Sequence, residues 1–180
     1  MKKFFLLLLL ITTSINFGQK QLETIISGGI GYGAISSNSP AISSLALHGS
    51  LSQEVGFLPV RIKLNYSYLR DSEFFLPMSN SANLYFSYLQ VINIGAELFQ
   101  YAGDYICFSE FFSYSLVKDN VFEGINSWAN GMMFSAEIGV LKSTSSLWFS
   151  AGFNYGLTFD KNMPAFSSFY IKANYSFGKI

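Results

Sequence analysis

Apolar and polar residues alternate with a period of two along most of the chain after residue 22. Alternation of this kind predicts β-strands that have one apolar and one polar face. The segment at 60–70, VRIKLNYSYLR, shows it most clearly, because Val, Ile, Leu and Tyr alternate with Arg, Lys, Asn and Ser. The pattern predicts eight strands, at about residues 23–35, 43–54, 60–70, 84–99, 104–116, 131–142, 146–159 and 166–177.

Two polar residues interrupt the apolar faces of these strands. Gln90 breaks the apolar face of the fourth strand, and Glu110 shares its parity with the apolar residues of the fifth. A β-bulge would reverse the parity locally, so we expect one to turn Glu110 to the polar face.

The stretch ISGGIGYGAI at 26–35 contains Gly29, Gly31 and Ala34 in the pattern G-x-G-x-x-A, which can bind a dinucleotide. That function requires a helix directly after the glycines, whereas the sequence continues with SSNSP, which is typical of a loop. Gly29, Gly31 and Gly33 instead form one face of the first strand. We interpret this face as lining a narrow interior or a sharp bend.

The predicted connections alternate in length. Those at 54–59, 101–104 and 142–145 are short, and those at 36–41, 71–83, 117–128 and 160–165 are longer. Short turns at one end and longer loops at the other are typical of outer-membrane β-barrels. An even number of strands places both termini at the short-turn, periplasmic end.

The start of the chain, MKKFFLLLLLITTSINFGQ, has the basic, apolar and polar regions of a secretory signal peptide. We predict a signal peptide at 1–19 and one barrel domain at 20–180. Of the 180 residues, 50% are hydrophobic and only 12% are charged, which favours a membrane barrel over a soluble domain. The net charge is zero, so nothing indicates nucleic-acid binding, and a single cysteine, Cys107, excludes an intramolecular disulfide.

The chain resembles the small OmpA/OmpX-type eight-stranded outer-membrane β-barrels of Gram-negative bacteria. The eight alternating segments and the ending YIKANYSF at 170–177 carry this resemblance. It implies an all-β, antiparallel, up-and-down transmembrane barrel in the outer membrane, monomeric and without cofactor or metal. Its partners would be outer-membrane lipid including lipopolysaccharide, the barrel insertion machinery and an extracellular partner that the sequence does not identify. Tyr175 and Phe177 would serve as the insertion signal.

Charged residues on the polar face should point into the barrel, because a charge facing lipid is costly. The sequence predicts an interior charge layer formed by His48, Arg61, Lys63, Glu97, Glu137 and Lys172. Three interpretations are open. The layer is a structural plug of paired charges, it is a gate in which His48 titrates near neutral pH, or it is partly paired with water in the gaps.

We expect a non-enzymatic barrel with a structural or surface-interaction role and extracellular loops as the contact surface. The candidate loop contact residues are apolar, namely Phe74, Phe75, Leu76, Met78, Phe122 and Trp128. The alternative is that they extend the strands or belong to an aromatic girdle. Three other functions stay open: transport of small or hydrophobic solutes through the lumen, a lipid A acyl hydrolase using His48, Ser50 and Glu54, and a soluble lipocalin-like lipid binder.

Overall fold

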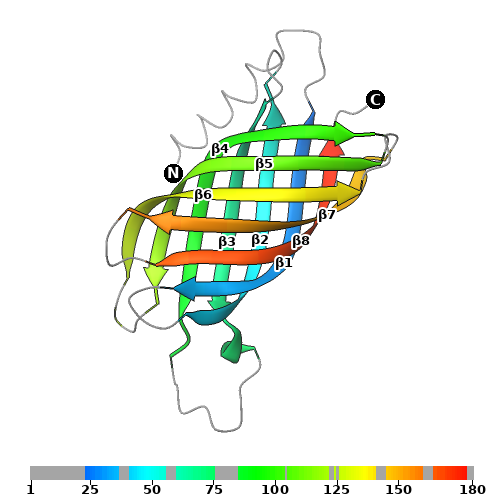
Figure 1. The fold of residues 1–180 in the computed structure, drawn as a ribbon. Coiled ribbons are helices and arrows are strands. Elements are labelled where there is room, and N and C mark those ends of the chain that lie inside the picture. Colours follow the sequence, from blue (N-terminus) through cyan, green and yellow to red (C-terminus); the bar gives the residue numbers. More distant parts are fainter. Residues whose placement is uncertain are drawn as a thin grey trace.

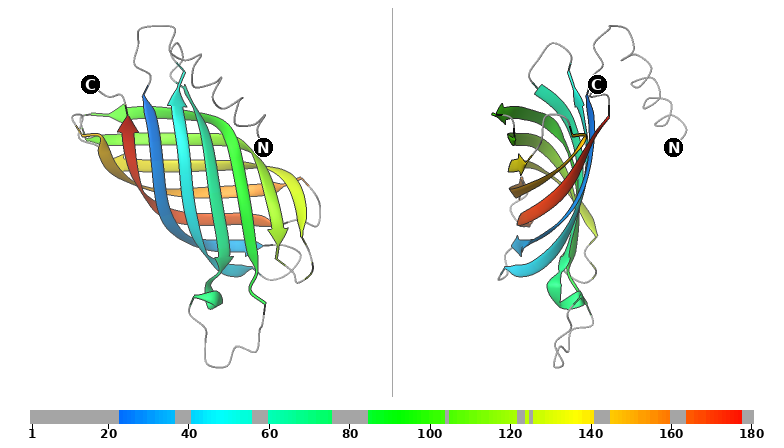
Figure 2. Two further views of the ribbon diagram at one scale, coloured as in Figure 1. Left: turned by 180° about the vertical axis from the view of Figure 1, so that it is seen from behind. Right: turned by 90° about the vertical axis from the view of Figure 1, so that its right-hand side faces the viewer.

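The computed structural model describes residues 23–36, 41–55, 60–75, 85–103, 105–121, 124, 126–140, 145–159 and 164–177. Its eight strands form one closed antiparallel barrel in sequence order, with β1 (blue) beside β8 (red) in Figures 1 and 2. The strands are β1 (Thr24–Ser36), β2 (Ile42–Glu54), β3 (Val60–Asp71), β4 (Tyr88–Ala102), β5 (Ile106–Asn120), β6 (Ser127–Val140), β7 (Leu147–Thr158) and β8 (Ala165–Phe177). A short 3-10 helix, η1 (Ser72–Phe74), follows β3.

The predicted number and order of strands are confirmed, and the main errors are at strand ends. β4 begins at Tyr88 rather than near residue 84, and β5 continues to Asn120 instead of ending near residue 116. The predicted loop at 117–128 therefore shrinks to 121–126. The connections at 141–146 and 159–164 are equally long, so only the connection at 72–87 is clearly longer than the rest. We call the end of the barrel that carries 72–87 the loop end, and the end that carries Glu23 and Phe177 the turn end.

The strands are steeply tilted. Following the pairing register once around the barrel leads from Thr24 of β1 to Ala34 of the same strand, an advance of ten residues, by way of Gln53, Ile62, Ala96, Phe112, Phe134, Tyr155 and Ser167. A stagger of this size in eight strands corresponds to a tilt of roughly 40°. Figure 1 shows the consequence, since strands on opposite sides of the barrel cross at a steep angle.

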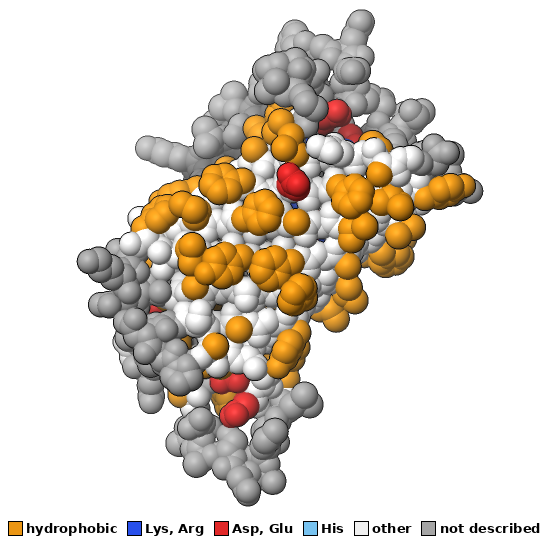
Figure 3. Space-filling view, viewed as in Figure 1, with side chains coloured by type: hydrophobic (Ala, Val, Ile, Leu, Met, Phe, Trp, Pro, Cys, Tyr) orange, Lys and Arg blue, Asp and Glu red, His pale blue; other side chains and the backbone are white. Residues whose placement is uncertain are grey.

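Apolar side chains cover the outside of the wall, and the inside is lined by polar side chains together with two buried apolar groups. Outward residues are strongly exposed, for example Phe169 at 71% and Phe149 at 65%, while most of the alternate positions are buried. Figure 3 shows hydrophobic side chains spread over one side of the barrel. This arrangement is opposite to that of a soluble barrel, so it disfavours the lipocalin-like alternative. No helix in the described part of the chain is long and apolar enough to cross a membrane.

Glu110 faces outward, and the predicted bulge is wrong. The pairing of β5 with β4 and β6 is continuous through this residue, which lies opposite Leu98 and Ala136. Glu110 therefore keeps the parity of its exposed neighbours Phe108 and Phe112. A regular ladder on both sides leaves no place for an extra residue, so the carboxylate stays on the apolar face.

Candidate functional site

Four buried charged residues meet at the centre of the barrel. Lys63 of β3 donates to Glu97 of β4 (Nζ–Oε1, 2.6 Å) and reaches across the lumen to Glu137 of β6 (Nζ–Oε1, 3.2 Å). Lys172 of β8 donates to the same Glu137 oxygen at 2.9 Å. The two lysines and two glutamates, which we call the central cluster, are therefore neutral in sum and cross-linked from four strands.

Hydroxyl groups complete the shell of the two carboxylates. Tyr170 donates to Glu137 Oε1 at 3.0 Å and Ser150 to its Oε2 at 3.2 Å. Ser109 donates to Glu97 Oε1 at 2.7 Å. Buried carboxylates are stable only when charges and hydrogen bonds compensate for the lost water, and both glutamates have such partners.

Glycines leave the space that the long side chains of the central cluster occupy. A Cβ atom on Gly29 would lie 2.5 Å from Lys172 Cγ and 2.2 Å from the carbonyl oxygen of Ile171. A Cβ atom on Gly152 would lie 2.8 Å from both Glu137 Cγ and Tyr170 Cε2. The face of β1 that carries Gly29, Gly31 and Gly33 thus lines a narrow interior. Packing in this interior accounts for the GxGxxA pattern, and dinucleotide binding is not needed to explain it.

His48 lies next to the central cluster but forms no ion pair with it. Its Nδ1 is 2.9 Å from Ser67 Oγ, its Nε2 is 3.2 Å from Ser168 Oγ, and its ring packs against Tyr170. Ser50 bonds to Ser27 instead of His48. The contacts needed by the hydrolase alternative are therefore not formed, and both residues face the closed interior.

Arg61 forms a second pair closer to the turn end. It donates to Glu23, and its guanidinium lies 3.9 Å from the centre of the Phe99 ring. Sequence reasoning missed Glu23 as its partner, because Glu23 lies at the edge of the first strand. Of the six residues predicted for the interior layer, the structure joins four in the central cluster and places Arg61 and His48 on either side of it.

Apolar side chains close the lumen on both sides of the central cluster. Toward the turn end, Ile25, Cys107 and Trp148 pack together with Phe99. Toward the loop end, a larger buried group fills the barrel, namely Ile35, Ala46, Leu69, Leu89, Val91, Phe111, Val117, Val121, Ala129, Met133 and Phe166. The cavity between the cluster and the turn-end group has a volume of about 20 Å³, so it holds no more than about one water molecule.

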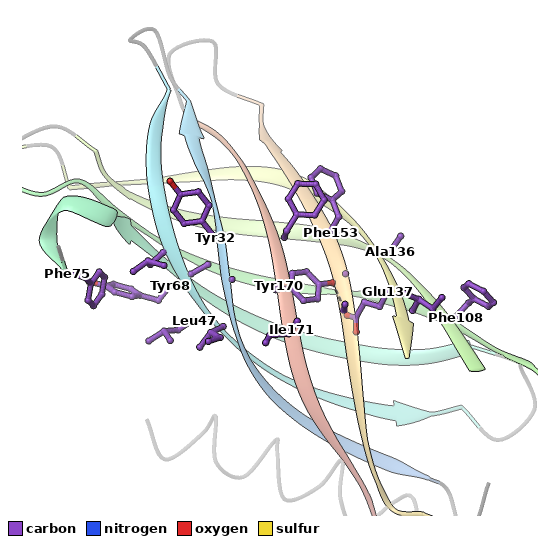
Figure 4. A pocket seen from close by; sticks show the side chains of 18 residues that line it. Tyr32, Leu47, Tyr68, Phe75, Phe108, Ala136, Glu137, Phe153, Tyr170 and Ile171 are labelled. Carbon is purple, nitrogen blue, oxygen red and sulfur yellow. Dashed lines mark hydrogen bonds between the residues drawn. The ribbon is translucent and has the colours of Figure 1, made fainter. Parts of the chain in front are cut away.

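A large hollow lies on the outside of the wall. It has a volume of about 1020 Å³ and is lined mainly by outward residues such as Tyr32, Leu47, Phe153 and Ile171 (Figure 4). These side chains belong to β1, β2, β7 and β8. Because this hollow opens to the surroundings of the barrel, it is not a channel through the barrel.

The predicted loop residues divide between helix, strand and undescribed segments. Phe74, on η1, and Phe75 are exposed and in edge-to-face contact at 5.1 Å, and Phe74 also contacts Phe86. Trp128 lies on β6 and is 57% exposed, as a girdle residue would be. The other predicted residues, Leu76, Met78 and Phe122, lie outside the described residues. Tyr175 and Phe177 are exposed at the end of β8 with ring centres 4.6 Å apart.

Comparison with known proteins shows the fold. No protein-family model and no curated protein matches the chain. Neisserial surface protein A (NspA) matches with a TM-score of 0.64 at 12% identity, over 86% of this chain and 97% of that protein. Ail, the attachment invasion locus protein of Yersinia pestis, matches with a TM-score of 0.58 at 11% identity, over 86% and 98%. A further Ail structure, in complex with the heparin analogue sucrose octasulfate, matches with a TM-score of 0.56 at 12% identity, over 87% and 99%. The fold is that of an OmpA/OmpX-type eight-stranded outer-membrane β-barrel.

Proposed function

We propose that this chain is a non-enzymatic barrel of the outer membrane whose contacts with other molecules lie at its loop end. The observation that carries the proposal is the closed lumen. Two apolar groups and a neutral, hydrogen-bonded charge cluster fill the barrel between them. A filled lumen does not pass solutes, so its role is structural and the working surface is outside.

Exposed aromatic residues at the loop end support a contact role. Phe74 and Phe75 are 41% and 46% exposed, and they lie at the end of η1, which projects beyond the strands of the barrel in Figure 1. In the proposed orientation this end faces the outside of the cell, and the turn end with both termini faces the periplasm. Exposed apolar surface on a projecting segment is a common feature of protein contact sites.

Location and closure are tested first. The barrel should be found in the outer-membrane fraction, and its band should shift between unheated and boiled gel samples. In planar bilayers it should give no conductance above that of the bare membrane, and vesicles that contain it should not become permeable to small sugars. Steady conductance would contradict the closed-lumen argument, and recovery in the soluble periplasmic fraction would contradict the location.

The contact role needs a matched pair of variants. Barrels in nanodiscs are exposed to arrays of extracellular proteins and glycans, as wild type, as Phe74→Ser/Phe75→Ser and as Trp128→Ser. The proposal expects the double variant to lose binding that the Trp128 variant keeps, because Trp128 belongs to the barrel wall. Equal binding by the wild type and both variants would show that the contact surface does not include η1.

A further inference from the structure

A layer of polar side chains crosses the lumen on the loop side of the central cluster. On β3, Asn65 and Ser67 lie between Lys63 of the central cluster and Leu69 of the loop-end apolar group. We call this layer the polar belt. It follows the wall through β5, β4, β3, β2, β8 and β7, and its buried members are Ser115, Asn93, Asn65, Ser67, His48, Ser168 and Asn154.

The hydrogen bonds around His48 all run in one direction. The single hydroxyl hydrogen of Ser168 goes to Asn154 Oδ1 at 3.0 Å, so Ser168 Oγ accepts from His48 Nε2 at 3.2 Å. An uncharged imidazole that donates at Nε2 accepts at Nδ1, where Ser67 Oγ lies at 2.9 Å. Ser67 in turn accepts from Asn65 Nδ2 at 3.1 Å. The direction from Asn65 to Asn154 therefore requires the uncharged form of His48 that carries its proton on Nε2.

The polar belt is interrupted between Asn65 and Asn93. These residues are directly opposite each other on β3 and β4, and they are 3% and 0% exposed. Ser115 donates to Asn93 Oδ1 at 2.6 Å, whereas Asn93 Nδ2 and Asn65 Oδ1 have no hydrogen-bond partner among the described residues. Opposite side chains on one face of a sheet are neighbours, so an unpaired donor and an unpaired acceptor lie side by side in the lumen. Buried polar groups are paired in most native proteins, because an unpaired one is costly.

We propose that one water molecule binds between Asn93 Nδ2 and Asn65 Oδ1 and completes the polar belt. Water accepts from the first group and donates to the second, whereas an ion of either sign would meet one group of the wrong polarity. The two apolar groups close the lumen on either side, so a larger molecule does not reach the site. With this water in place, the hydrogen bonds run from Ser115 to Asn154 without a reversal.

The completed belt gives His48 a structural role. Its ring packs against Tyr170, and Gly31 leaves space for it, since a Cβ atom there would lie 3.2 Å from His48 Nε2. Both ring nitrogens are used within the belt, which joins β2 to β3 and β8. This arrangement favours a structural His48 over a gate. It is independent of the contact role proposed for the loop end, because every group involved lies inside the barrel.

Nuclear magnetic resonance of the barrel in nanodiscs tests the water site. In the wild type, the Asn93 side-chain amide should show a nuclear Overhauser contact with water, and the nitrogen shifts of His48 should show a proton on Nε2 and none on Nδ1. Asn65→Leu removes the acceptor of the water and should abolish the contact. Asn154→Leu is the matched control, because it lies at the far end of the belt, and it should keep the contact. A wild type without the contact, or with the proton on Nδ1, would overturn the proposal.

A double-mutant cycle tests whether the two amides share a partner. Asn65→Leu and Asn93→Leu should each lower the equilibrium constant of folding about tenfold, because each leaves a buried polar group unpaired. The double variant should lose less than the product of the two factors, since the second change removes the group that the first leaves unpaired. Factors that multiply would show that nothing links the two amides, which contradicts the proposal.

Two further measurements separate the remaining explanations. A crystal structure with a direct hydrogen bond between Asn65 and Asn93 would overturn the water site, and an ordered water within hydrogen-bond distance of both amides would support it. The heat-shifted gel band, checked for each variant, shows that the barrel has folded, so a failed cycle among folded variants counts against the water site. A wild type that lacks the heat shift counts against the proposed function instead.

Discussion

Two glutamates on neighbouring strands show how differently the two sides of this wall treat a charge. Glu110 of β5 is opposite Ala136 of β6, and Glu137 is the next residue along that strand. The two carboxylates are therefore at nearly the same depth, one outside and one inside. Glu137 has two lysines and two hydroxyl groups as partners, whereas no ion pair among the described residues involves Glu110.

The difference between the two glutamates indicates that the placement of a charge is strictly constrained inside the barrel and weakly constrained outside it. Inside the narrow lumen, every charge of the central cluster needs an opposite charge within reach, because water is excluded. Outside, a single carboxylate is surrounded by Leu98, Phe108, Phe112 and Ala136. An outward carboxylate costs free energy in lipid but disturbs no packing, so the barrel tolerates it.

Removing the inner carboxylate should have the largest effect. Glu137→Gln leaves Lys172 without an acidic partner and Lys63 with only Glu97. Breaking a buried ion pair costs about 3–5 kcal/mol, so the free energy of unfolding should fall by roughly that amount. Urea unfolding in lipid vesicles, followed by tryptophan fluorescence, measures it.

A second substitution sharpens this test. Glu137→Gln/Lys172→Gln removes both charges and leaves Lys63 paired with Glu97. The double variant should be more stable than Glu137→Gln alone, because the unpaired buried cation is gone. If Lys172→Gln gave no recovery, the cost of the first change would come from packing and not from charge.

The glycine face of β1 offers a matched pair of variants. Gly29→Ala would place a Cβ atom 2.2 Å from the Ile171 carbonyl oxygen, whereas a Cβ on Gly49 of β2 meets nothing within 4 Å. Overpacking of a filled interior costs about 1–3 kcal/mol, so Gly29→Ala should lower the free energy of unfolding by about 2 kcal/mol. Gly49→Ala should be neutral or slightly stabilising, because alanine restricts the unfolded chain. The same urea experiment compares them, and equal effects would contradict an inward glycine face.

The sequence specifies the strands and their faces well, and the contacts between strands less well. Parity alone predicts that Lys63, Glu137 and Lys172 share the inner face, since every second residue of a strand points the same way. It does not predict that Lys63 meets Glu137 across the lumen, because that contact depends on the stagger of all the strands between them. The apolar group at the loop end was also missed, since Phe111, Met133 and Phe166 stand among serines and asparagines on faces that the alternation marks as polar.

Replacing the outer carboxylate should have the smallest effect and the opposite sign. A charged side chain facing lipid is destabilising, and the cost for glutamate is below the 2–4 kcal/mol of lysine or arginine. Glu110→Leu should therefore raise the free energy of unfolding in lipid vesicles, by about 1 kcal/mol. The replacement disturbs no partner within the barrel, so the gain should come from the lipid and should be smaller for the detergent-solubilised barrel. Destabilisation by Glu110→Leu in vesicles would show that the carboxylate has a partner at this face. The two glutamates would then differ in where their partners lie, inside or outside the barrel, and not in whether they have partners.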